Sequence, residues 1–341
     1  SEKMKVLVTG GLGYIGSHTA VELSKNFKTI IVDNLINSNI SVINGINKIS
    51  KSKVEFEKID LTISKDVKNL FDKYPDIDGI IHFAALKSVG ESVDDPVSYY
   101  HNNIVSLLNI LKEIKVRKMS INFIFSSSCT VYGQSDNLPI TENEEIKTAL
   151  SPYGNTKQIC EEILSDYSKI ASNFNVTSLR YFNPIGAHES AEIGELPLET
   201  PQNLIPFITQ SVAGVRGELT VFGDDYDTHD GTCIRDYIHV VDLAEAHICA
   251  LNYLIKNKGI DNEVFNIGTG KGNSVLEVIR EFENVTGLRI KYKIGKRRKG
   301  DITSAFANNS KAIDKLSWKP NYSLADALLS AWKWEKKIRK I

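Results

Sequence analysis

The 341-residue sequence lacks a charge imbalance, a cysteine pattern and a long apolar segment. Its net charge of -1 gives no electrostatic basis for binding nucleic acid or a membrane surface. The four cysteines are scattered, and their spacing fits neither a zinc site nor a disulfide framework. No apolar run approaches the roughly 20 residues of a membrane span, and no signal-peptide pattern precedes the first expected strand. We therefore expect a protein of a reducing compartment, the cytoplasm, with neither nucleic-acid nor membrane partners.

What the sequence does contain is a regular alternation of apolar strand patterns and helical patterns. The expected strands span residues 5–9, 29–32, 54–58, 79–83, 121–126 and 176–180. The expected helices run from the first glycine-rich turn to about residue 25 and over 64–74, 98–116 and 151–171. Repeated strand–helix–strand units predict an α/β fold with a doubly wound parallel sheet of Rossmann type.

The alternation breaks after residue 183. Residues 185–237 are rich in Gly, Pro, Asp and Thr, with one helical stretch at 204–213. Further on, the sequence predicts helices at 240–254, 274–286 and 323–338 and a strand at 264–267, and Ser274 with Glu277 has the form of a capping box. We expect a dinucleotide-binding domain over 1–183 that is re-entered at about 237–267. A smaller C-terminal substrate-binding lobe would comprise 184–236 and 268–341.

Three glycines lie between the first expected strand and the helix after it. Gly10 permits a tight turn, Gly13 lets the backbone approach a pyrophosphate, and Gly16 lets helix and strand pack closely. The following helix N-terminus favours an anion. Asp33 ends the second strand, where a carboxylate accepts hydrogen bonds from ribose hydroxyls and repels a 2′-phosphate. This context predicts a site for NAD rather than NADP; the alternative for Asp33 is a plain turn residue.

Tyr153 and Lys157 face the same side of an expected helix, one turn apart. A phenol has an unperturbed pKa of about 10, and a neighbouring ammonium favours the phenolate, so the pair predicts a general base. A sufficient pKa shift needs a second positive charge, for which an oxidised nicotinamide is a candidate. Ser128 follows the strand at 121–126, at the end where ligands bind in such sheets. The alternatives are a chance Tyr-x-x-x-Lys spacing and a solvated serine turn.

Taken together, these motifs resemble the extended short-chain dehydrogenase/reductase family. The segments 6–18, 81–92, 180–188 and 235–240 narrow the resemblance to UDP-galactose (UDP-glucose) 4-epimerases, and 272–275 and 297–301 continue it. The match covers essentially the whole chain in order. It implies a tightly bound NAD and the interconversion of UDP-galactose and UDP-glucose through a 4-keto intermediate. It also implies a homodimer formed through the helices around 98–116 and 151–171.

The resemblance assigns a role to each matching residue. Tyr153 would be the base for the sugar 4-hydroxyl, Ser128 would hold that oxygen, and Lys157 would bind the nicotinamide ribose. The implied cofactor positions are Gly10, Gly13, Tyr14, Ile15, Gly16, Asp33, Asn34, Asp60, Leu61, Phe83, Ala84, Lys87, Asn102, Tyr153, Lys157 and Phe182. The implied substrate positions are Lys87, Ser128, Tyr153, Asn183, Asn203, Leu204, Thr220, Val221, Phe222, Arg235, Tyr237, Val275, Arg298, Asp301 and Ala305.

The chemistry of several of these side chains agrees with the assignment. Phe222 can lie against a uracil face, and Arg235 and Arg298 are suited to gripping a diphosphate. The alternative for the basic run 296–299 is a solvated turn, which we accept for all of its residues except Arg298. The histidines at 188, 229 and 239 have no metal-ligand spacing, so we expect no metal.

Ala305 lies where the family lines the sugar pocket, and it is smaller than the usual occupant. A small residue there implies room for a 2-acetamido group, so we expect UDP-GalNAc and UDP-GlcNAc to be substrates too. The alternative is a surface-loop alanine, with Phe306 closing the pocket. Two rival functions remain: a 4,6-dehydratase of the same fold, and a non-catalytic dinucleotide sensor. The dehydratase needs a carboxylate pair where Cys129 and Thr130 follow Ser128, and the sensor has no need of the catalytic set.

Overall fold

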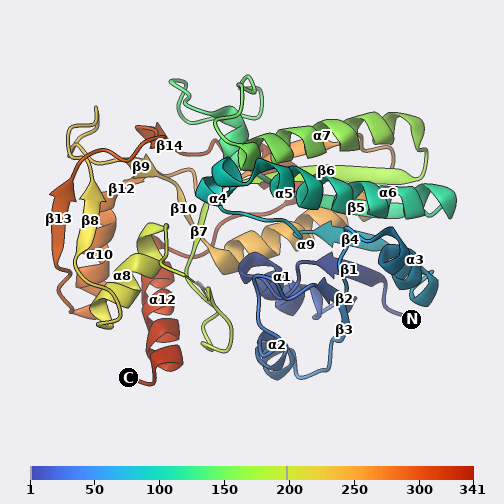
Figure 1. Ribbon diagram of the computed structural model, residues 1–341, viewed down its shortest axis with the longest axis horizontal. Helices are drawn as coiled ribbons and strands as arrows, with labels where there is room; N and C mark the ends of the chain where they lie inside the picture. Colours follow the sequence, from blue (N-terminus) through green and yellow to red (C-terminus); the bar gives the residue numbers. More distant parts are fainter. Residues whose placement is uncertain (1, 197–198) are drawn as a thin grey trace.

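The computed structural model describes residues 2–196 and 199–341 and contains a seven-stranded sheet at its centre (Figure 1). The strand order is β11-β6-β5-β4-β1-β2-β3, and every neighbouring pair is parallel. The strands are β1 (Lys5–Thr9), β2 (Lys28–Asp33), β3 (Glu55–Lys58), β4 (Gly79–His82), β5 (Ile121–Ser128), β6 (Phe174–Tyr181) and β11 (Glu263–Ile267). The order reverses between β1 and β4, which places the expected ligand crevice at the carboxyl ends of these two strands. The predicted α/β fold class is confirmed.

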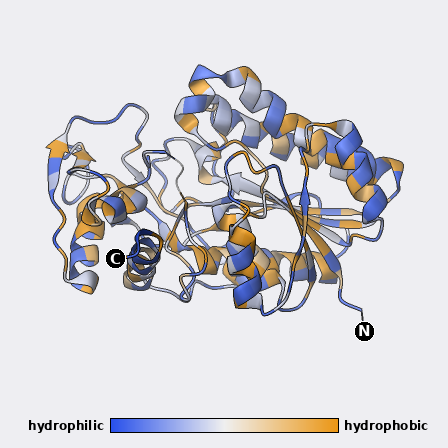
Figure 2. Ribbon diagram, turned by 60° about the horizontal axis from the view of Figure 1, so that its bottom comes forward, coloured by the Kyte–Doolittle hydropathy of each residue, from blue (hydrophilic) through white to orange (hydrophobic). Residues whose placement is uncertain are grey.

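Helices cover both faces of this sheet. One face packs against α3 (Ser64–Lys73), α6 (Ser106–Val116) and α7 (Pro152–Ile170), and the other against α1 (Tyr14–Leu23) and α9 (Val240–Lys256) (Figure 1). Successive strand side chains alternate between two separate hydrophobic clusters, which explains why the strands read as continuous apolar runs. In Figure 2 most helices alternate between hydrophobic and hydrophilic residues, as expected of helices with one covered face.

The helix expected over 98–116 is divided into three parts. Helix α5 (Pro96–Tyr100) is followed by a π-helical turn, η1 (His101–Val105), and only then by α6. The wider turn places Asn102 and Asn103 next to each other at the end of the sheet where the candidate site lies. Such turns recur at functional sites, and periodicity cannot distinguish them from an ordinary helix.

Three helices escaped the sequence prediction. They are α2 (Val42–Ser50), α4 (Val89–Asp94) and α11 (Ser310–Leu316). Helix α4 has six residues and α11 has seven, too few for a helical period to stand out from the surrounding loop.

Short strands and three helices form a second group of elements beside the sheet (Figure 1). Their common core joins α8 (Leu204–Val212), α10 (Val275–Thr286) and α12 (Leu324–Arg339). The predicted capping box at Ser274 and Glu277 is present at the start of α10. The strands are β8 (Leu219–Phe222), β9 (Ile234–Arg235), β12 (Asn273–Ser274), β13 (Tyr292–Gly295) and β14 (Ser304–Ala305). Two further short strands, β7 (Asn183–Ile185) and β10 (Tyr237–His239), pair with each other where the chain passes between the sheet and this group. We refer to the elements around this core as the lobe.

In the part of the chain that the structure describes, no helix has the length and apolarity needed to cross a membrane.

Candidate active site

The glycine turn between β1 and α1 has the close backbone packing that its sequence predicts. Gly10 has a φ of +67°, and a Cβ there would lie 2.8 Å from the amide nitrogen of Ala84. A Cβ on Gly16 would lie 2.3 Å from the carbonyl oxygen of Gly10. Gly13 is the N-cap of α1 and offers no side chain of its own to that helix end. The turn is therefore a cradle that side chains would fill, and it fits the pyrophosphate of a dinucleotide.

The two acidic residues among the expected cofactor positions, Asp33 and Asp60, lie at the carboxyl ends of β2 and β3. The Asp33 carboxylate accepts hydrogen bonds from the amide nitrogens of Leu12 at 3.2 Å and Leu35 at 2.9 Å. Asp60 Oδ1 accepts from the amide of Thr62 at 2.9 Å. These bonds fix the Asp33 side chain directly beside the glycine turn, where a ribose next to the pyrophosphate would lie. Asn34 and Leu61 follow the two strands.

Buried side chains frame the same crevice. The Tyr14 hydroxyl donates to the carbonyl of Gly186 at 2.5 Å, which ties the glycine turn to the segment after β7. Phe83 directly follows β4, and Phe182 directly follows β6. Both side chains are buried, as is that of Ile15. Ala84 donates its amide proton to Thr9 Oγ1 at 3.2 Å.

Lys87 and Glu195 lie close enough to affect each other's charge. Lys87 is exposed to solvent, yet the protein surrounding its ammonium lowers its pKa, as expected for a side chain in a crevice. Burial raises the pKa of Glu195 to about 7, and the positive charge of Lys87 opposes that rise. The sequence prediction missed Glu195, because no motif links it to a residue more than a hundred positions earlier.

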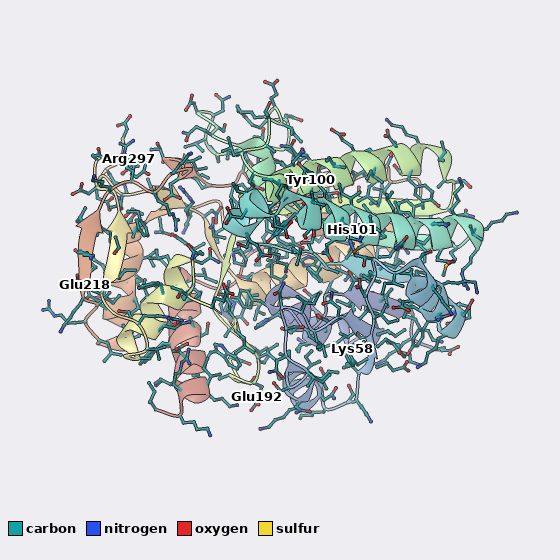
Figure 3. All side chains as sticks on the ribbon, in the orientation of Figure 1. Lys58, Tyr100, His101, Glu192, Glu218 and Arg297 are labelled. Carbon is teal, nitrogen blue, oxygen red and sulfur yellow. The ribbon has the colours of Figure 1, made fainter. Side chains whose placement is uncertain are left out.

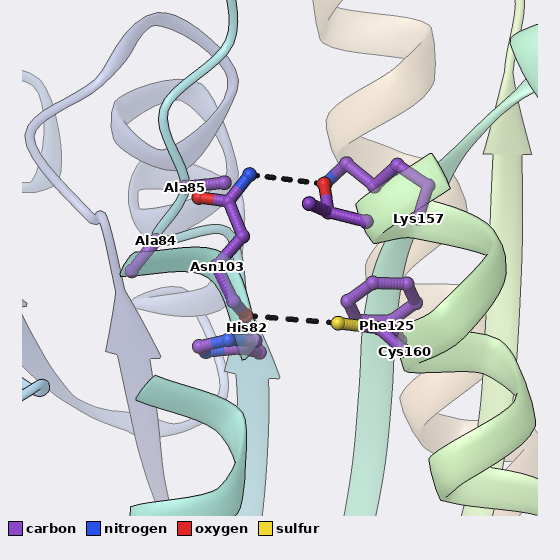
Figure 4. A pocket seen from close by; sticks show the side chains of 8 residues that line it. His82, Ala84, Ala85, Asn103, Phe125, Lys157 and Cys160 are labelled. Atoms are coloured by element: carbon purple, nitrogen blue, oxygen red, sulfur yellow. Dashed lines mark hydrogen bonds between the residues drawn. The ribbon is translucent and has the colours of Figure 1, made fainter. Parts of the chain in front are cut away.

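Asn103 is a second residue that the prediction missed. Its side chain accepts from the amide of Leu86 at 2.8 Å and donates to the carbonyl of the same residue at 3.1 Å. It also donates to Thr156 Oγ1 at 3.1 Å, between Tyr153 and Lys157 on α7. Figure 4 shows Asn103 facing α7 beside a small cavity of about 10 Å³ that His82, Lys157 and other side chains line. Asn103 therefore links the loop after β4 to the helix that carries the expected base.

The helix α7 begins as its sequence requires. Ser151 is the N-cap and accepts from the amide of Gly154 at 3.1 Å, while Pro152 occupies the first helical position. The Tyr153 amide donates to Ser92 Oγ at 3.1 Å. These contacts set the position of the first turn, from which the Tyr153 side chain extends.

Lys157 is buried and bound to the end of β5. Its ammonium donates to the carbonyl of Ser126 at 2.7 Å and lies 5.8 Å from the centre of the Tyr153 ring. Burial lowers the pKa of Lys157 to about 8, and the charge of Lys87 adds to that effect. Ser128 ends β5, and its hydroxyl accepts from the amide of Thr130 at 3.1 Å.

The pKa of Tyr153 differs from the expectation. Burial raises it above the ordinary value, whereas the proximity of Lys157 was expected to lower it. The physical reason is that Lys157 directs its ammonium to the Ser126 carbonyl, and desolvation of the phenol outweighs the remaining attraction. Burial thus acts against the phenolate, and the second positive charge expected from the sequence would favour it.

Several of the expected substrate residues meet in the lobe. Arg298 donates to both carboxylate oxygens of Asp301 at 3.1 Å, and its guanidinium carbon lies 5.1 Å from the centre of the Phe222 ring. Arg298 also donates to the carbonyl of Gln202 at 3.2 Å, next to Asn203 and Leu204 at the start of α8. Thr220 and Val221 precede Phe222 in β8. The arrangement presents an aromatic face and a guanidinium side by side.

A second set of expected substrate residues lies on paired short strands nearer the sheet. Arg235 in β9 pairs with Ala305 in β14, and Tyr237 in β10 pairs with Asn183 in β7. Burial raises the pKa of the Cys129 thiol to about 12 and the nearby Arg235 opposes the rise, so β9 lies close to the residue after Ser128. Val275 begins α10, and its amide donates to the carbonyl of Cys233 at 3.1 Å.

His229, Asp230 and Glu277 come together although their sequence spacing suggests no metal site. His229 Nε2 lies 3.2 Å from Glu277 Oε1 and 3.7 Å from Asp230 Oδ2, which is close enough to hold an ion. Both carboxylates also accept hydrogen bonds from Ser274. Sequence spacing could not show this group, because Glu277 is far from the other two along the chain.

Known proteins are similar to this chain over nearly its whole length. A family profile described as GDP-mannose 4,6 dehydratase matches residues 7–330. A UDP-glucose 4-epimerase of Yersinia enterocolitica is 45% identical over 334 residues, covering 98% of each chain. The Dictyostelium discoideum UDP-glucose 4-epimerase is 45% identical over 336 residues, covering 97% of this chain and 95% of its own.

A solved structure gives the same result. The UDP-glucose 4-epimerase of Stenotrophomonas maltophila, crystallised with NAD and formylated UDP-arabinopyranose, superposes with a TM-score of 0.95 at 44% identity. That alignment covers 99% of each chain. The chain therefore belongs to the UDP-glucose 4-epimerase family within the extended short-chain dehydrogenases/reductases.

Proposed function

We propose that this protein interconverts UDP-galactose and UDP-glucose by inverting the configuration at C4 of the hexose. The observation that carries the proposal is that β5 and α7 bring Ser128, Tyr153 and Lys157 to the carboxyl-terminal ends of the central strands, where the glycine turn also lies. We call this region the sheet edge. The epimerases of similar sequence and structure support it, as does the bound NAD in the Stenotrophomonas maltophila enzyme. The dehydratase alternative is weaker, because Cys129 and Thr130 follow Ser128 where that chemistry needs carboxylates.

Each candidate site residue has its own role in the proposed reaction. Tyr153 takes the proton from the sugar 4-hydroxyl, and Ser128 holds that oxygen by a hydrogen bond. Lys157 binds the ribose and adds positive charge beside the phenol. NAD, held by the glycine turn and Asp33, supplies a hydride acceptor and donor when bound. Such an exchange would leave the sugar with no net oxidation, and the 4-keto form of the sugar would be the intermediate.

The lobe would hold the UDP group while the sugar turns. Phe222 offers an aromatic face to the uracil, and Arg298 and Arg235 offer guanidinium groups to the diphosphate. An anchored diphosphate is required because the 4-keto sugar must turn to present its opposite face while it stays bound to the protein. We accordingly propose that residues 184–236 and 268–341 form the UDP-sugar lobe, and that 1–183 with 237–267 form the dinucleotide domain.

The substrate range of the proposed enzyme includes acetamido sugars. Ala305 is buried in β14, so the alternative of a surface-loop alanine does not hold. A methyl side chain at this position takes up less room than a large aromatic residue would. A Campylobacter jejuni UDP-Glc/GlcNAc 4-epimerase among the similar structures, at 38% identity, supports this breadth within the family.

We further propose that two copies pair through α5, η1, α6 and α7, and that the dimer acts in the cytoplasm. Val97 and Leu108 present exposed apolar side chains on this helical run. Figure 3 labels Tyr100 and His101 on the same run. Burying such side chains against a second copy would be favourable. Light scattering coupled to size exclusion measures the mass in solution, and a monomer over a wide concentration range would exclude this pairing.

The test of the function is incubation of the purified protein with UDP-galactose and no added cofactor. UDP-glucose should form until the two sugars reach equilibrium, and denaturation of the protein should release NAD rather than NADP. A product that has lost water would identify a dehydratase. No turnover with NAD supplied, despite bound dinucleotide, would identify a sensor.

A further inference from the structure

The strand that ends at Ser128 carries a second serine that takes no part in the proposed chemistry. Ser127 lies between Ser126, whose carbonyl binds Lys157, and Ser128. Successive side chains of a strand point to opposite faces, so Ser127 points away from the face that Ser128 occupies. Its hydroxyl donates to Glu161 Oε2 at 2.5 Å, and both side chains are buried.

Glu161 lies one helical turn after Lys157 on α7 and is the acceptor of a buried ion pair. Arg180 of β6 donates to its two carboxylate oxygens, from Nε at 3.1 Å and from Nη2 at 2.6 Å. Both residues are less than 10% exposed. The pair is bidentate, which fixes the relative orientation of the carboxylate and the guanidinium.

The remaining donor of Arg180 reaches the segment that follows Ser128. Its Nη1 donates to the Tyr132 hydroxyl at 2.9 Å, and the guanidinium lies 5.0 Å from the centre of that ring. The Tyr132 hydroxyl in turn donates to Asn266 Oδ1 of β11 at 2.6 Å. Tyr132 ends the 3₁₀ turn Cys129–Tyr132, which begins directly after Ser128.

Ser128 is therefore bracketed by one connected network. The residue before it is bound to Glu161, and the turn after it is bound to Arg180 through Tyr132. We infer that Glu161 and Arg180 are positioning residues that fix Ser128, and with it the oxygen of the sugar, relative to Tyr153. The inference rests on the proposed function, in which Ser128 holds that oxygen.

Stability alone is a poor reason for this network. Burying an ion pair removes two charges from water, and well-packed apolar residues of similar volume are often at least as stable. A bidentate pair that also engages two hydroxyls defines one geometry, because each donor and acceptor is satisfied only there. The network ties β5, β6, α7 and the turn after β5, which are the elements that meet at Ser128.

The test uses two variants that remove one hydroxyl each and leave the ion pair intact. Ser127→Ala breaks the bond before Ser128, and Tyr132→Phe breaks the bond after it while keeping the ring. A misplacement by about 1 Å can lower turnover up to a hundredfold, so each variant should lose about tenfold in kcat. The KM for UDP-galactose should stay within about twofold, because the lobe residues that bind UDP are untouched.

Two matched controls remove buried hydroxyls elsewhere. Thr177→Val deletes a hydroxyl of β6 that donates to the carbonyl of Glu263, and Tyr74→Phe deletes one that donates to Glu57 at 2.8 Å. Neither residue is part of the network. Thermal unfolding should show similar shifts for variants and controls, and the controls should keep kcat within about twofold of the unaltered protein.

Crystal structures of the two network variants give a readout that does not depend on turnover. The separation between Ser128 Oγ and Tyr153 Oη should differ from that in the unaltered protein, and in the controls it should not. A loss of kcat without such a shift, or an equal loss in the controls, would overturn the inference. If the unaltered protein does not epimerise UDP-galactose, the proposed function fails, whereas the Ser128 displacement still decides the inference.

Discussion

The sheet edge and the lobe hold their side chains in opposite ways. At the sheet edge, Lys157 is buried and bound to a backbone carbonyl, and Tyr153 extends from a helix whose first turn is capped and tied. In the lobe, Phe222 is 42% exposed and the Arg298 side chain is 44% exposed, on a short strand and in a loop. Burial at the sheet edge changes proton affinities, whereas the Arg298 guanidinium of the lobe, although paired with Asp301, stays partly solvated and accessible to a ligand.

This difference predicts a division of kinetic effects. Changes at the sheet edge should lower kcat, because they alter groups whose charge or position matters during the reaction. Changes in the lobe should raise KM, because they remove contacts that substrate and transition state share.

The largest effect is expected from Tyr153→Phe. The variant loses the hydroxyl that takes the sugar proton but keeps the ring packing. General base catalysis contributes roughly 10²–10⁴-fold, so kcat for UDP-galactose should fall by that order. UDP binding by calorimetry should remain near that of the unaltered protein. Tyr167→Phe on the same helix is the control, and activity within a few-fold in Tyr153→Phe would show that another group is the base.

The next effect concerns Lys157 and the pH profile. The Lys157 ammonium lies 5.8 Å from the centre of the Tyr153 ring. Two charges at roughly that separation interact by about 3 kcal/mol at an effective dielectric constant of about 20, or about two pKa units. Lys157→Met removes this cation beside a phenol whose pKa burial already raises. Less phenolate then exists at neutral pH, so kcat near pH 7 should fall about a hundredfold and rise again as the pH increases. A uniform loss at every pH would mean that Lys157 acts only by binding the ribose.

These two residues also show how far the sequence could be read. The Tyr153 and Lys157 spacing, the glycine turn and the parallel strands are local patterns, and local patterns were enough to predict the fold class and to select these residues. The direction of the Tyr153 pKa shift depends on where the Lys157 ammonium points and on how much protein surrounds the phenol. Neither is encoded in the spacing.

Contacts between distant segments could not be predicted from the sequence either. Asn103 joins the loop after β4 to α7, and Arg180 of β6 joins α7 to the turn after β5. Each looks ordinary in the sequence, since an asparagine in a helix and an arginine in a strand carry no motif. The segment containing Arg180 does match the epimerases, but resemblance gave that residue no role.

A smaller effect, of the opposite kinetic type, is expected in the lobe. Arg298→Met removes a guanidinium that lies over Phe222 and is suited to the diphosphate. Hydrogen bonds to charged groups contribute about 1.5–3 kcal/mol, so KM should rise about tenfold to a hundredfold with little change in kcat. The neighbouring Arg297→Met is the control, because Arg297 binds Asp225 and carries no expected substrate role. A kcat loss larger than the KM change would break the division between the two regions.

Of the four variants, Ala305→Tyr should change UDP-galactose turnover least. It tests the place where the sheet edge and the lobe meet. Ala305 belongs to a lobe strand, yet it packs in one cluster with Val131, Tyr132 and Phe182 from the sheet half. A side chain that enlarges here must occupy space beside both regions, so its effect should depend on the size of the sugar rather than on the base or the UDP contacts. Overpacking costs typically 1–3 kcal/mol, which corresponds to at least about a fivefold loss of turnover for the larger acetamido sugars.

We expect the unaltered protein to interconvert UDP-GalNAc and UDP-GlcNAc, and Ala305→Tyr to lose this reaction while UDP-galactose turnover stays within a few-fold. Separation of the nucleotide sugars after incubation measures both reactions in the same preparation. Ala305→Ser is the matched control, because its side chain remains small and both reactions should survive. Equal losses for both sugars in Ala305→Tyr would mean that the new ring disturbs Tyr132 and the turn after Ser128. Absence of acetamido-sugar turnover in the unaltered protein would instead assign the limit of the pocket to another side chain, with Phe306 the first to truncate.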